Sequence, residues 1–169
     1  VERVLVSHSF RNHGSQQPDS AAGRLLGIIQ RHRIPINSVG RGDVIKIGAL
    51  QCSILNPQMG EACRSVNDES IVALFSRTGE SEPAILMTGD AQDQALARIM
   101  QRYPDLRAEA MELPHHGSWR DTAVDFVRHV DPRHVLQSTG PARFLLDRWA
   151  EVMRGRTRLV TSRDGAISI

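Results

Sequence analysis

Three strand-like stretches of this sequence run directly into polar residues. Residues 4–13 read VLVSHSFRNH, residues 85–90 read ILMTGD, and residues 111–118 read MELPHHGS. Strand ends hold side chains rigidly at the rim of a sheet, and ligands of α/β proteins bind at such rims. The three stretches supply imidazoles, a carboxylate and a hydroxyl, so we expect a functional site where they meet.

The rest of the sequence predicts one α/β domain over residues 1–169. The chain is 24% charged with a net charge of +2, as in an ordinary globular domain. Short apolar runs rich in β-branched residues predict strands at 3–6, 44–47, 51–55, 71–75, 84–87, 108–113, 134–137, 158–161 and 166–169. Helical periodicity predicts helices at 21–33, 91–103, 122–130 and about 142–154. Early strands are joined as hairpins and later strands alternate with helices, so both antiparallel and parallel pairing are expected.

No apolar run approaches the roughly 18 residues that span a bilayer, so we expect no membrane contact from this segment. No export signal is visible, and the sequence leaves localisation unknown. Because Val1 enters directly into a strand, we expect the chain to be part of a longer protein. Cys52 and Cys63 lack the spacing of a zinc or redox pair and are expected to be free thiols.

The polar strand ends are suited to holding a divalent metal ion. Such an ion binds imidazole nitrogen and carboxylate oxygen, and ligands from separate strand ends can converge on it without a local motif. His8, His13, Asp90 and His115 meet that need. The alternative is that Asp90 caps the helix predicted from Ala91 and that the histidines are ordinary loop residues.

In their order along the chain, these motifs resemble the metallo-β-lactamase-fold domain of ComEC-type DNA-uptake (competence) proteins. The matching elements are Ser7-His8 with His13, the segment Asn67 to Ser70 before a strand, the strand ending Thr88-Gly89-Asp90, and Pro114 to Ser118. The resemblance implies an αββα metallo-β-lactamase-like sandwich, whose opening strands would precede Val1.

The same resemblance implies a function. It implies a metal-dependent hydrolase, using zinc or manganese, of the phosphodiesterase or nuclease kind, with DNA or another phosphodiester as partner and a membrane-associated parent chain. It gives His8, His13, Asp90 and His115 the role of metal ligands, with Asp90 as the bridging one. Asp90, His116 and Ser118 would form the catalytic group, in which His116 or Ser118 contacts the substrate phosphate.

The first motif departs from the family pattern. The family carries histidines and aspartates where this chain has His8-Ser9-Phe10-Arg11-Asn12-His13. Phe10 cannot ligate a metal, and Asn12 offers only a neutral amide oxygen. The later Asn and His-Pro element is not recognisable in residues 141–146. We therefore expect one bound ion or none, and a non-catalytic module with a structural or interaction role is the competing hypothesis.

Other polar residues near these motifs have two interpretations each. His116 could orient its neighbour instead of binding phosphate, and Trp119 could stack on a base or close the core. Asn67 and Ser70 are expected to shape the loop beneath the site. A further set could follow a nucleic-acid backbone or form a solvated face: Arg120, Arg128, Arg133 and Arg143.

Overall fold

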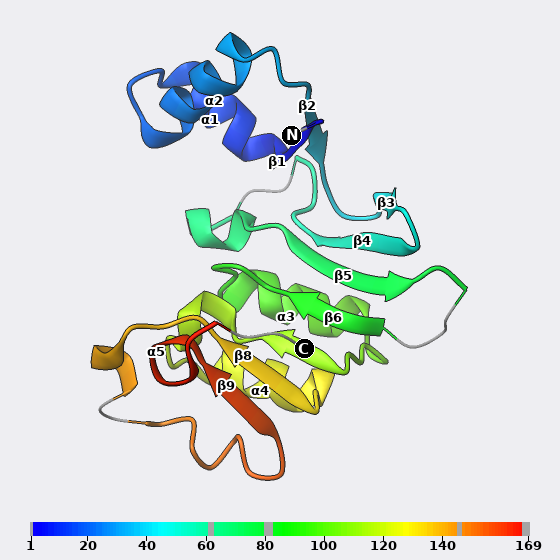
Figure 1. Ribbon diagram of the computed structural model, residues 1–169, viewed down its shortest axis with the longest axis vertical. Coiled ribbons are helices and arrows are strands. Elements are labelled where there is room, and N and C mark those ends of the chain that lie inside the picture. The colour runs from blue at the N-terminus through cyan, green and yellow to red at the C-terminus, as the bar shows by residue number, and fades with distance from the viewer. Residues whose placement is uncertain (1, 61–62, 80–82, 145–146, 167–169) are drawn as a thin grey trace.

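The computed structural model describes residues 2–60, 63–79, 83–144 and 147–166, and a seven-stranded sheet is its main feature (Figure 1). The strand order is β3-β4-β5-β6-β7-β8-β9, antiparallel from β3 to β6 and parallel from β6 to β9. The strands are β3 (Val44–Ile47), β4 (Leu50–Asn56), β5 (Val72–Arg77), β6 (Pro83–Met87), β7 (Ala110–Glu112), β8 (His134–Gln137) and β9 (Thr157–Val160). The predicted hairpins and the predicted parallel pairing are confirmed.

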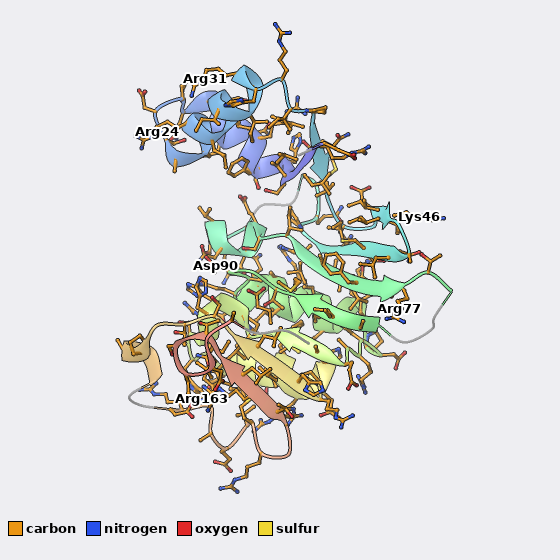
Figure 2. All side chains as sticks on the ribbon, in the orientation of Figure 1. Arg24, Arg31, Lys46, Arg77, Asp90 and Arg163 are labelled. Carbon is orange, nitrogen blue, oxygen red and sulfur yellow. The ribbon has the colours of Figure 1, made fainter. Side chains whose placement is uncertain are left out.

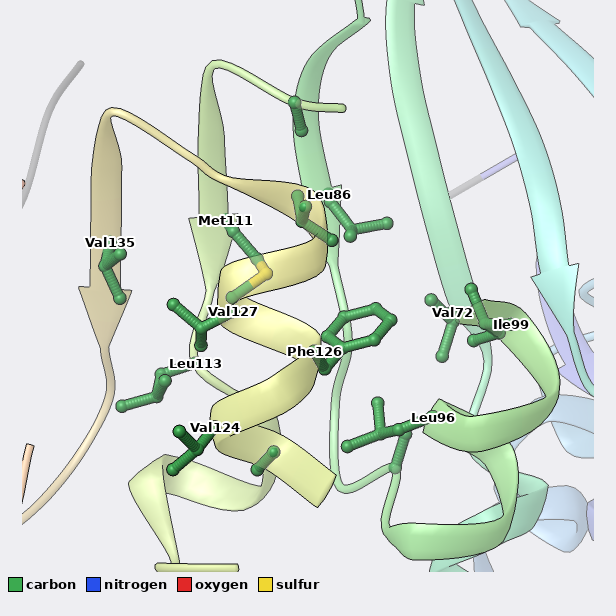
Figure 3. Packing of buried hydrophobic residues seen from close by; sticks show 14 of the residues in the cluster. Val72, Leu86, Leu96, Ile99, Met111, Leu113, Val124, Phe126, Val127 and Val135 are labelled. Carbon is green, nitrogen blue, oxygen red and sulfur yellow. The ribbon is translucent and has the colours of Figure 1, made fainter. Parts of the chain in front are cut away.

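The main core lies between this sheet and two helices, α3 (Asp93–Arg102) and α4 (Asp121–Val130) (Figure 3). Leu96 and Ile99 of α3 and Phe126 and Val130 of α4 are almost completely buried. These positions recur every three to four residues, which places them on one face of each helix. The sequence periodicity predicted both helices for this reason.

A second sheet contains only two parallel strands, β1 (Val4–Ser7) and β2 (Ile36–Val39). Between them lie two helices, α1 (His8–Gln16) and α2 (Ala21–Arg31), which pack against each other at the opposite end of the molecule from β8 and β9 (Figure 1). Ser20 caps α2, as expected, because its hydroxyl oxygen accepts a hydrogen bond from the Gly23 N–H at 3.0 Å. A smaller buried cluster of Val39, Cys52, Ile54 and Ala73 joins β2 to β4 and β5.

Two predictions about the chain's elements were wrong. The region expected to be a helix at about 142–154 forms a short 3₁₀ helix, η3 (Pro141–Phe144), and then turns within its described residues. The periodic apolar residues there, Trp149, Val152 and Met153, are buried, but as parts of turns. Thr161, expected to end the strand at 158–161, begins the short helix α5 (Thr161–Asp164), and residues 167–169 of the last predicted strand lie outside the described part.

The mixed α/β class predicted from the sequence is confirmed, and the two cysteines are free thiols. Burial raises the pKa of the Cys52 thiol above its ordinary value. Among the described residues, no helix is both long and apolar enough to cross a membrane.

Candidate active site at the carboxyl edge of the parallel strands

The carboxyl ends of the parallel strands lie along one edge of the large sheet. After β6 the chain continues into Thr88-Gly89-Asp90, after β7 into the 3₁₀ helix η2 (Pro114–Gly117), and after β8 into Ser138. The backbones of the first two loops are joined directly, because the His115 N–H donates to the Gly89 carbonyl at 2.9 Å. Two of the three polar strand ends recognised in the sequence therefore meet.

Glu112 links the end of β6 to the end of β7 through hydrogen bonds. Its carboxylate accepts hydrogen bonds from the N–H groups of Thr88 (3.1 Å) and Gly89 (2.9 Å). The buried Thr88 hydroxyl donates in turn to the Glu112 carbonyl at 3.0 Å. Hydrogen bonds to a carboxylate are among the stronger ones in proteins, so this junction is rigid. Nothing in the sequence alone indicated this role of Glu112.

Three consecutive residues of η2 have left-handed backbone. The φ angles of His115, His116 and Gly117 are 48°, 58° and 77°. This region is unfavourable for residues with a side chain, and such conformations persist where the surroundings impose them. Non-glycine residues in this conformation gather at functional sites, which supports a functional interpretation of the His-His pair.

A buried polar network supports this loop from below. Gln137, at the end of β8, is 1% exposed and donates to the His116 carbonyl at 3.2 Å. Its side-chain oxygen accepts from Arg158 at 2.6 Å and 3.1 Å. Arg158 also binds both carboxylate oxygens of Asp147 at 2.7 Å. The network holds the His116 backbone in place, and sequence reasoning missed it because Gln137 reads only as a polar strand residue.

At the top of this edge, His116 contacts Asp90. The His116 Nε2 atom lies 3.2 Å from the Asp90 Oδ1 atom, and both side chains are about half exposed. The other ring nitrogen, Nδ1, lies 3.0 Å from the Ser138 carbonyl oxygen, which can only accept. Both ring nitrogens thus lie beside oxygen atoms that can accept a hydrogen bond from a ring N–H group. Asp90 is visible at this edge in Figure 2.

The alternative role of Asp90 as a helix cap is wrong. Helix α3 begins at Asp93 after Gln92, which makes no side-chain cap. The cap comes instead from Asp68, in the 3₁₀ helix η1 (Val66–Glu69). Its buried carboxylate accepts from the N–H groups of Gln92 (3.2 Å) and Ala95 (3.0 Å). Asp90 is therefore available for the site, and the capping residue is one that sequence reasoning missed.

His115 points to a different partner from that of His116. Its Nδ1 atom lies 2.6 Å from the side-chain nitrogen of Gln92, and the two histidine rings are 6.3 Å apart between centroids. An amide nitrogen donates, so Nδ1 of His115 is the acceptor in this contact. Of Ser118, the structure shows that its backbone N–H donates to the His115 carbonyl at 2.9 Å.

His8 and His13 lie on α1, where both are exposed. This helix contacts α2, β1 and β2. No group of three or more histidine, cysteine, aspartate or glutamate side chains suited to a metal ion occurs among the described residues. The predicted set of His8, His13, Asp90 and His115 is therefore not assembled as one group. Asp90 and His116 together offer only two of the four or more donors that a zinc ion takes. The described residues do not fit a two-ion centre.

Neighbouring residues have mostly structural contacts. Ser70 lies beside the Gly89 backbone, and the segment containing Asn67 and Ser70 is held by the Asn56 amide, which donates to the carbonyls of Asp68 (2.9 Å) and Ser70 (2.8 Å). The Trp119 ring meets that of Trp149 edge to face at 5.0 Å and packs against the core.

The arginines suggested as a nucleic-acid surface are largely engaged with acids. Arg120 binds Asp93 at 2.8 Å, while Arg128 and Arg133 lie 3.7 Å from Asp125 and Glu109. The Arg143 side chain lies outside the described part of the chain. Paired arginines of this kind favour a solvated face over a phosphate track.

Comparison with known proteins finds a sequence relative and a solved structure of similar fold. No family model matches the chain. The chain is 27% identical over 140 residues to ComE operon protein 3 of Bacillus subtilis, a match that covers 83% of this chain and 17% of that protein.

Among solved structures, a variant of CmlA beta-hydroxylase matches with a TM-score of 0.56 and 15% identity, covering 94% of this chain and 38% of that one. The metallo hydrolase Igni18 of Ignicoccus hospitalis matches with a TM-score of 0.43 and 11% identity, over 80% of this chain and 61% of that one. The chain therefore shares its α/β fold with part of CmlA beta-hydroxylase and is similar in sequence to a segment of ComE operon protein 3.

Proposed function

We propose that this chain is a phosphodiesterase-like hydrolase domain whose substrate binds at the carboxyl edge of β6, β7 and β8. The observation that carries the proposal is the contact between Asp90 and His116, with His116 oriented by the Ser138 carbonyl. An oriented imidazole beside a carboxylate can hold and move a proton, which is what hydrolysis of a phosphodiester requires of protein groups. When His116 carries both protons, its Nε2–H can donate to a phosphate oxygen that approaches Asp90.

A divalent ion, zinc or manganese, would supply an activated water to such a reaction. Asp90 and His116 are the described residues placed to approach it together, and His8, His13 and His115 remain predicted ligands that the structure does not bring to them. Ser118 follows η2 directly and is proposed to contact the substrate phosphate.

The second candidate function is a non-catalytic module with a structural or interaction role. One specific observation favours it: residues 8–16, which would carry the first metal motif, form a regular helix that includes Phe10 and Asn12. Restoring carboxylates there with Phe10→Asp and Asn12→Asp should raise both the metal content and hydrolysis if the hydrolase proposal is right. Unchanged metal content in that double variant would favour the module.

The proposed setting rests on the resemblance of the motifs to the domain of DNA-uptake proteins, together with the similarity to part of ComE operon protein 3. The resemblance suggests DNA as the phosphodiester, and residues 1–169 would then form one domain of a longer, membrane-associated protein. This setting is a proposal, because the chain covers 17% of that relative.

Asp90→Asn tests the proposed site. The substitution keeps the shape of the side chain but removes its charge, so hydrolysis of a chromogenic phosphodiester and of single-stranded DNA, with Mn²⁺ or Zn²⁺ added, should fall about a hundredfold or more. Asp125→Asn is the matched control, because Asp125 is an exposed residue of α4. Metal content should be measured on protein purified without added ions.

The outcomes separate the two functions. Equal, non-zero rates for the wild type and Asp90→Asn would exclude Asp90 from the reaction. A folded wild-type protein that hydrolyses neither substrate with any added ion would reject the hydrolase in favour of the module.

A further inference from the structure

An open cleft lies at the far end of α3 from Asp90. It has a volume of about 640 Å³ and is lined by Arg41, from the connection between β2 and β3, and by four residues at the end of α3. These four are Arg98, Gln101, Arg102 and Tyr103. Every one of the five side chains carries a hydrogen-bond donor, and no carboxylate is among the described residues that line the cleft.

Two of the arginines have no partner in the described part of the chain. No described group forms an ion pair or hydrogen bond with the side chains of Arg41 and Arg102, although Arg41 is only partly exposed. Arg98 lies one helical turn before Arg102 and donates weakly to the Cys63 sulfur at 3.7 Å, among other contacts. Like charges four residues apart on a helix repel each other, and a third guanidinium at the same cleft adds to that cost.

We infer that this cleft binds a phosphate group, carried by a nucleic-acid strand or by a free phosphate compound. Guanidinium groups match the geometry of phosphate oxygens and bind them through paired hydrogen bonds. A bound phosphate would offset the mutual repulsion of the arginines. The cleft is larger than a phosphate ion, and a smaller cavity that shares Arg41, Arg98, Arg102 and Tyr103 continues it toward Asn56 and Gln58. The rest of a nucleotide could lie within the open cleft itself.

The cleft and the proposed hydrolytic site are separate. The ten residues of α3 rise about 15 Å, with Asp90 before the first turn and Arg102 in the last. Binding in the cleft therefore needs neither Asp90 nor a metal ion, and it does not rest on the proposed hydrolysis.

A purely structural role would explain part of the arrangement. Arg102 lies in the last turn of α3, where a cation interacts favourably with the free carbonyl groups of the helix end. That role does not account for Arg41, which reaches the same cleft from another part of the chain.

The test compares two double variants of equal charge. Arg41→Gln with Arg102→Gln removes the two cleft arginines that have no partner in the described part of the chain. Arg24→Gln with Arg31→Gln removes two exposed arginines of α2 (Figure 2). Binding of a short, fluorescein-labelled oligothymidylate is measured by anisotropy across a salt series. Urea unfolding and near-ultraviolet circular dichroism check that each variant is folded.

The cleft variant should bind the oligonucleotide about tenfold more weakly or worse, because two charge-assisted contacts are lost. The magnitude of the slope of log affinity against log salt concentration should fall by about 1.4, because each of the two lost phosphate contacts on a single strand contributes about 0.7. The α2 control should bind as the wild type does. Competition by pyrophosphate would identify a free phosphate compound as a sufficient ligand, whereas its failure to compete would identify the polymer.

Equal weakening in the two double variants would overturn the inference, because binding would then reflect net charge alone. Undiminished binding by the folded cleft variant, or no binding by the wild type of either oligothymidylate or pyrophosphate at low salt, would overturn it as well. None of these results depends on hydrolysis, so the two proposals can fail separately.

Discussion

Gly117 has no room for a side chain. A Cβ atom there would lie 2.3 Å from Nε2 of Gln137, and its φ of 77° is unfavourable for any other residue. We predict that Gly117→Ala lowers the free energy of unfolding by about 2–5 kcal/mol, of which about 1–2 kcal/mol comes from the left-handed backbone and about 1–3 kcal/mol from overpacking. Urea unfolding measures this loss.

Gly155→Ala is the matched control, since Gly155 has a φ of 78° and a Cβ atom added there would meet nothing within 4 Å. It should cost only the backbone component, about 1–2 kcal/mol. Equal losses of unfolding free energy in the two variants would show that the Gln137 network beneath η2 deforms at little energetic cost. That result would contradict the rigid support described for His116.

Asp164 gives a prediction on pH dependence. The Arg163 guanidinium beside it, followed by the Val160 backbone N–H, lowers the pKa of its carboxyl from 3.8 to about 2. A lowered folded-state pKa contributes stability that is present above the unfolded value and is lost as the pH falls toward 2. Asp164→Asn should therefore lower the melting temperature at pH 6, and the difference should shrink below about pH 4.

The direct measurement is a carbon NMR titration of the Asp164 carboxyl, with a midpoint expected near 2. Arg163→Gln should move that midpoint back toward 3.8. A midpoint at the ordinary value in the wild type would show that the Arg163 contact does not persist in solution.

At the scale of elements, α3 depends on a cap supplied by a different part of the chain. The Asp68 carboxylate, in η1, accepts from two N–H groups at the start of α3. Asp68→Ala should lower the free energy of unfolding by about 1–3 kcal/mol, because it leaves buried donors without a partner. Asp68→Asn keeps an acceptor oxygen and should cost less.

Asp125→Ala, on the exposed face of α4, should change stability by no more than about 0.5 kcal/mol. Denaturant unfolding of Asp68→Ala, Asp68→Asn and Asp125→Ala tests these predictions. If Asp68→Ala is as stable as Asp125→Ala, the cap contributes nothing, and the close association of η1 with α3 would need another explanation.

The elements that the sequence predicted are those with a strong local pattern. Periodic apolar residues identified α3 and α4, and β-branched runs identified most strands of the large sheet. Helix α1 has no apolar periodicity and was not predicted. It is held by its cap at Ser7 and by close packing of Gly14 on α2, where a Cβ atom would lie 2.5 Å from Leu26.

The prediction failed around Trp149 for the opposite reason. Its neighbourhood has helical periodicity, but long-range contacts decide the structure: the Trp149 indole donates to the Gly117 carbonyl at 2.8 Å, and Asp147 pairs with Arg158. Long-range contacts also limit what the sequence predicts about the candidate site. The meeting of Asp90 with His116 follows from the order of parallel strands, whereas the support from Gln137 depends on residues far apart in the sequence.

At the scale of the whole molecule, the two hydrophobic clusters differ in size. The larger one joins α3 and α4 to the large sheet, and the smaller one, with Val39 and Ile54, joins the two-stranded sheet to β4 and β5. Elements with fewer buried apolar contacts open at a lower free energy. We predict that the opening free energies for hydrogen exchange are lower for the amides of α1 and α2 than for the amides of β6, β7 and β8.

Native-state hydrogen exchange measured by NMR tests this difference. Opening free energies for Leu26 and Ile29 of α2 should lie clearly below those for Leu86 and Met111, which are fully buried in the main core. Equal values would show that the molecule opens as one cooperative unit.

The strand order has one consequence for chemical labelling. Strand β3 forms an edge of the seven-stranded sheet, and it carries Lys46, the one lysine in the sequence (Figure 2). Lys46 is exposed, as are Val44 and Ile47 on the same strand. An amine-reactive dye therefore marks a single side chain, apart from the α-amino group. Because another strand could pair with this edge, the rate of dye attachment reports whether a second chain covers it.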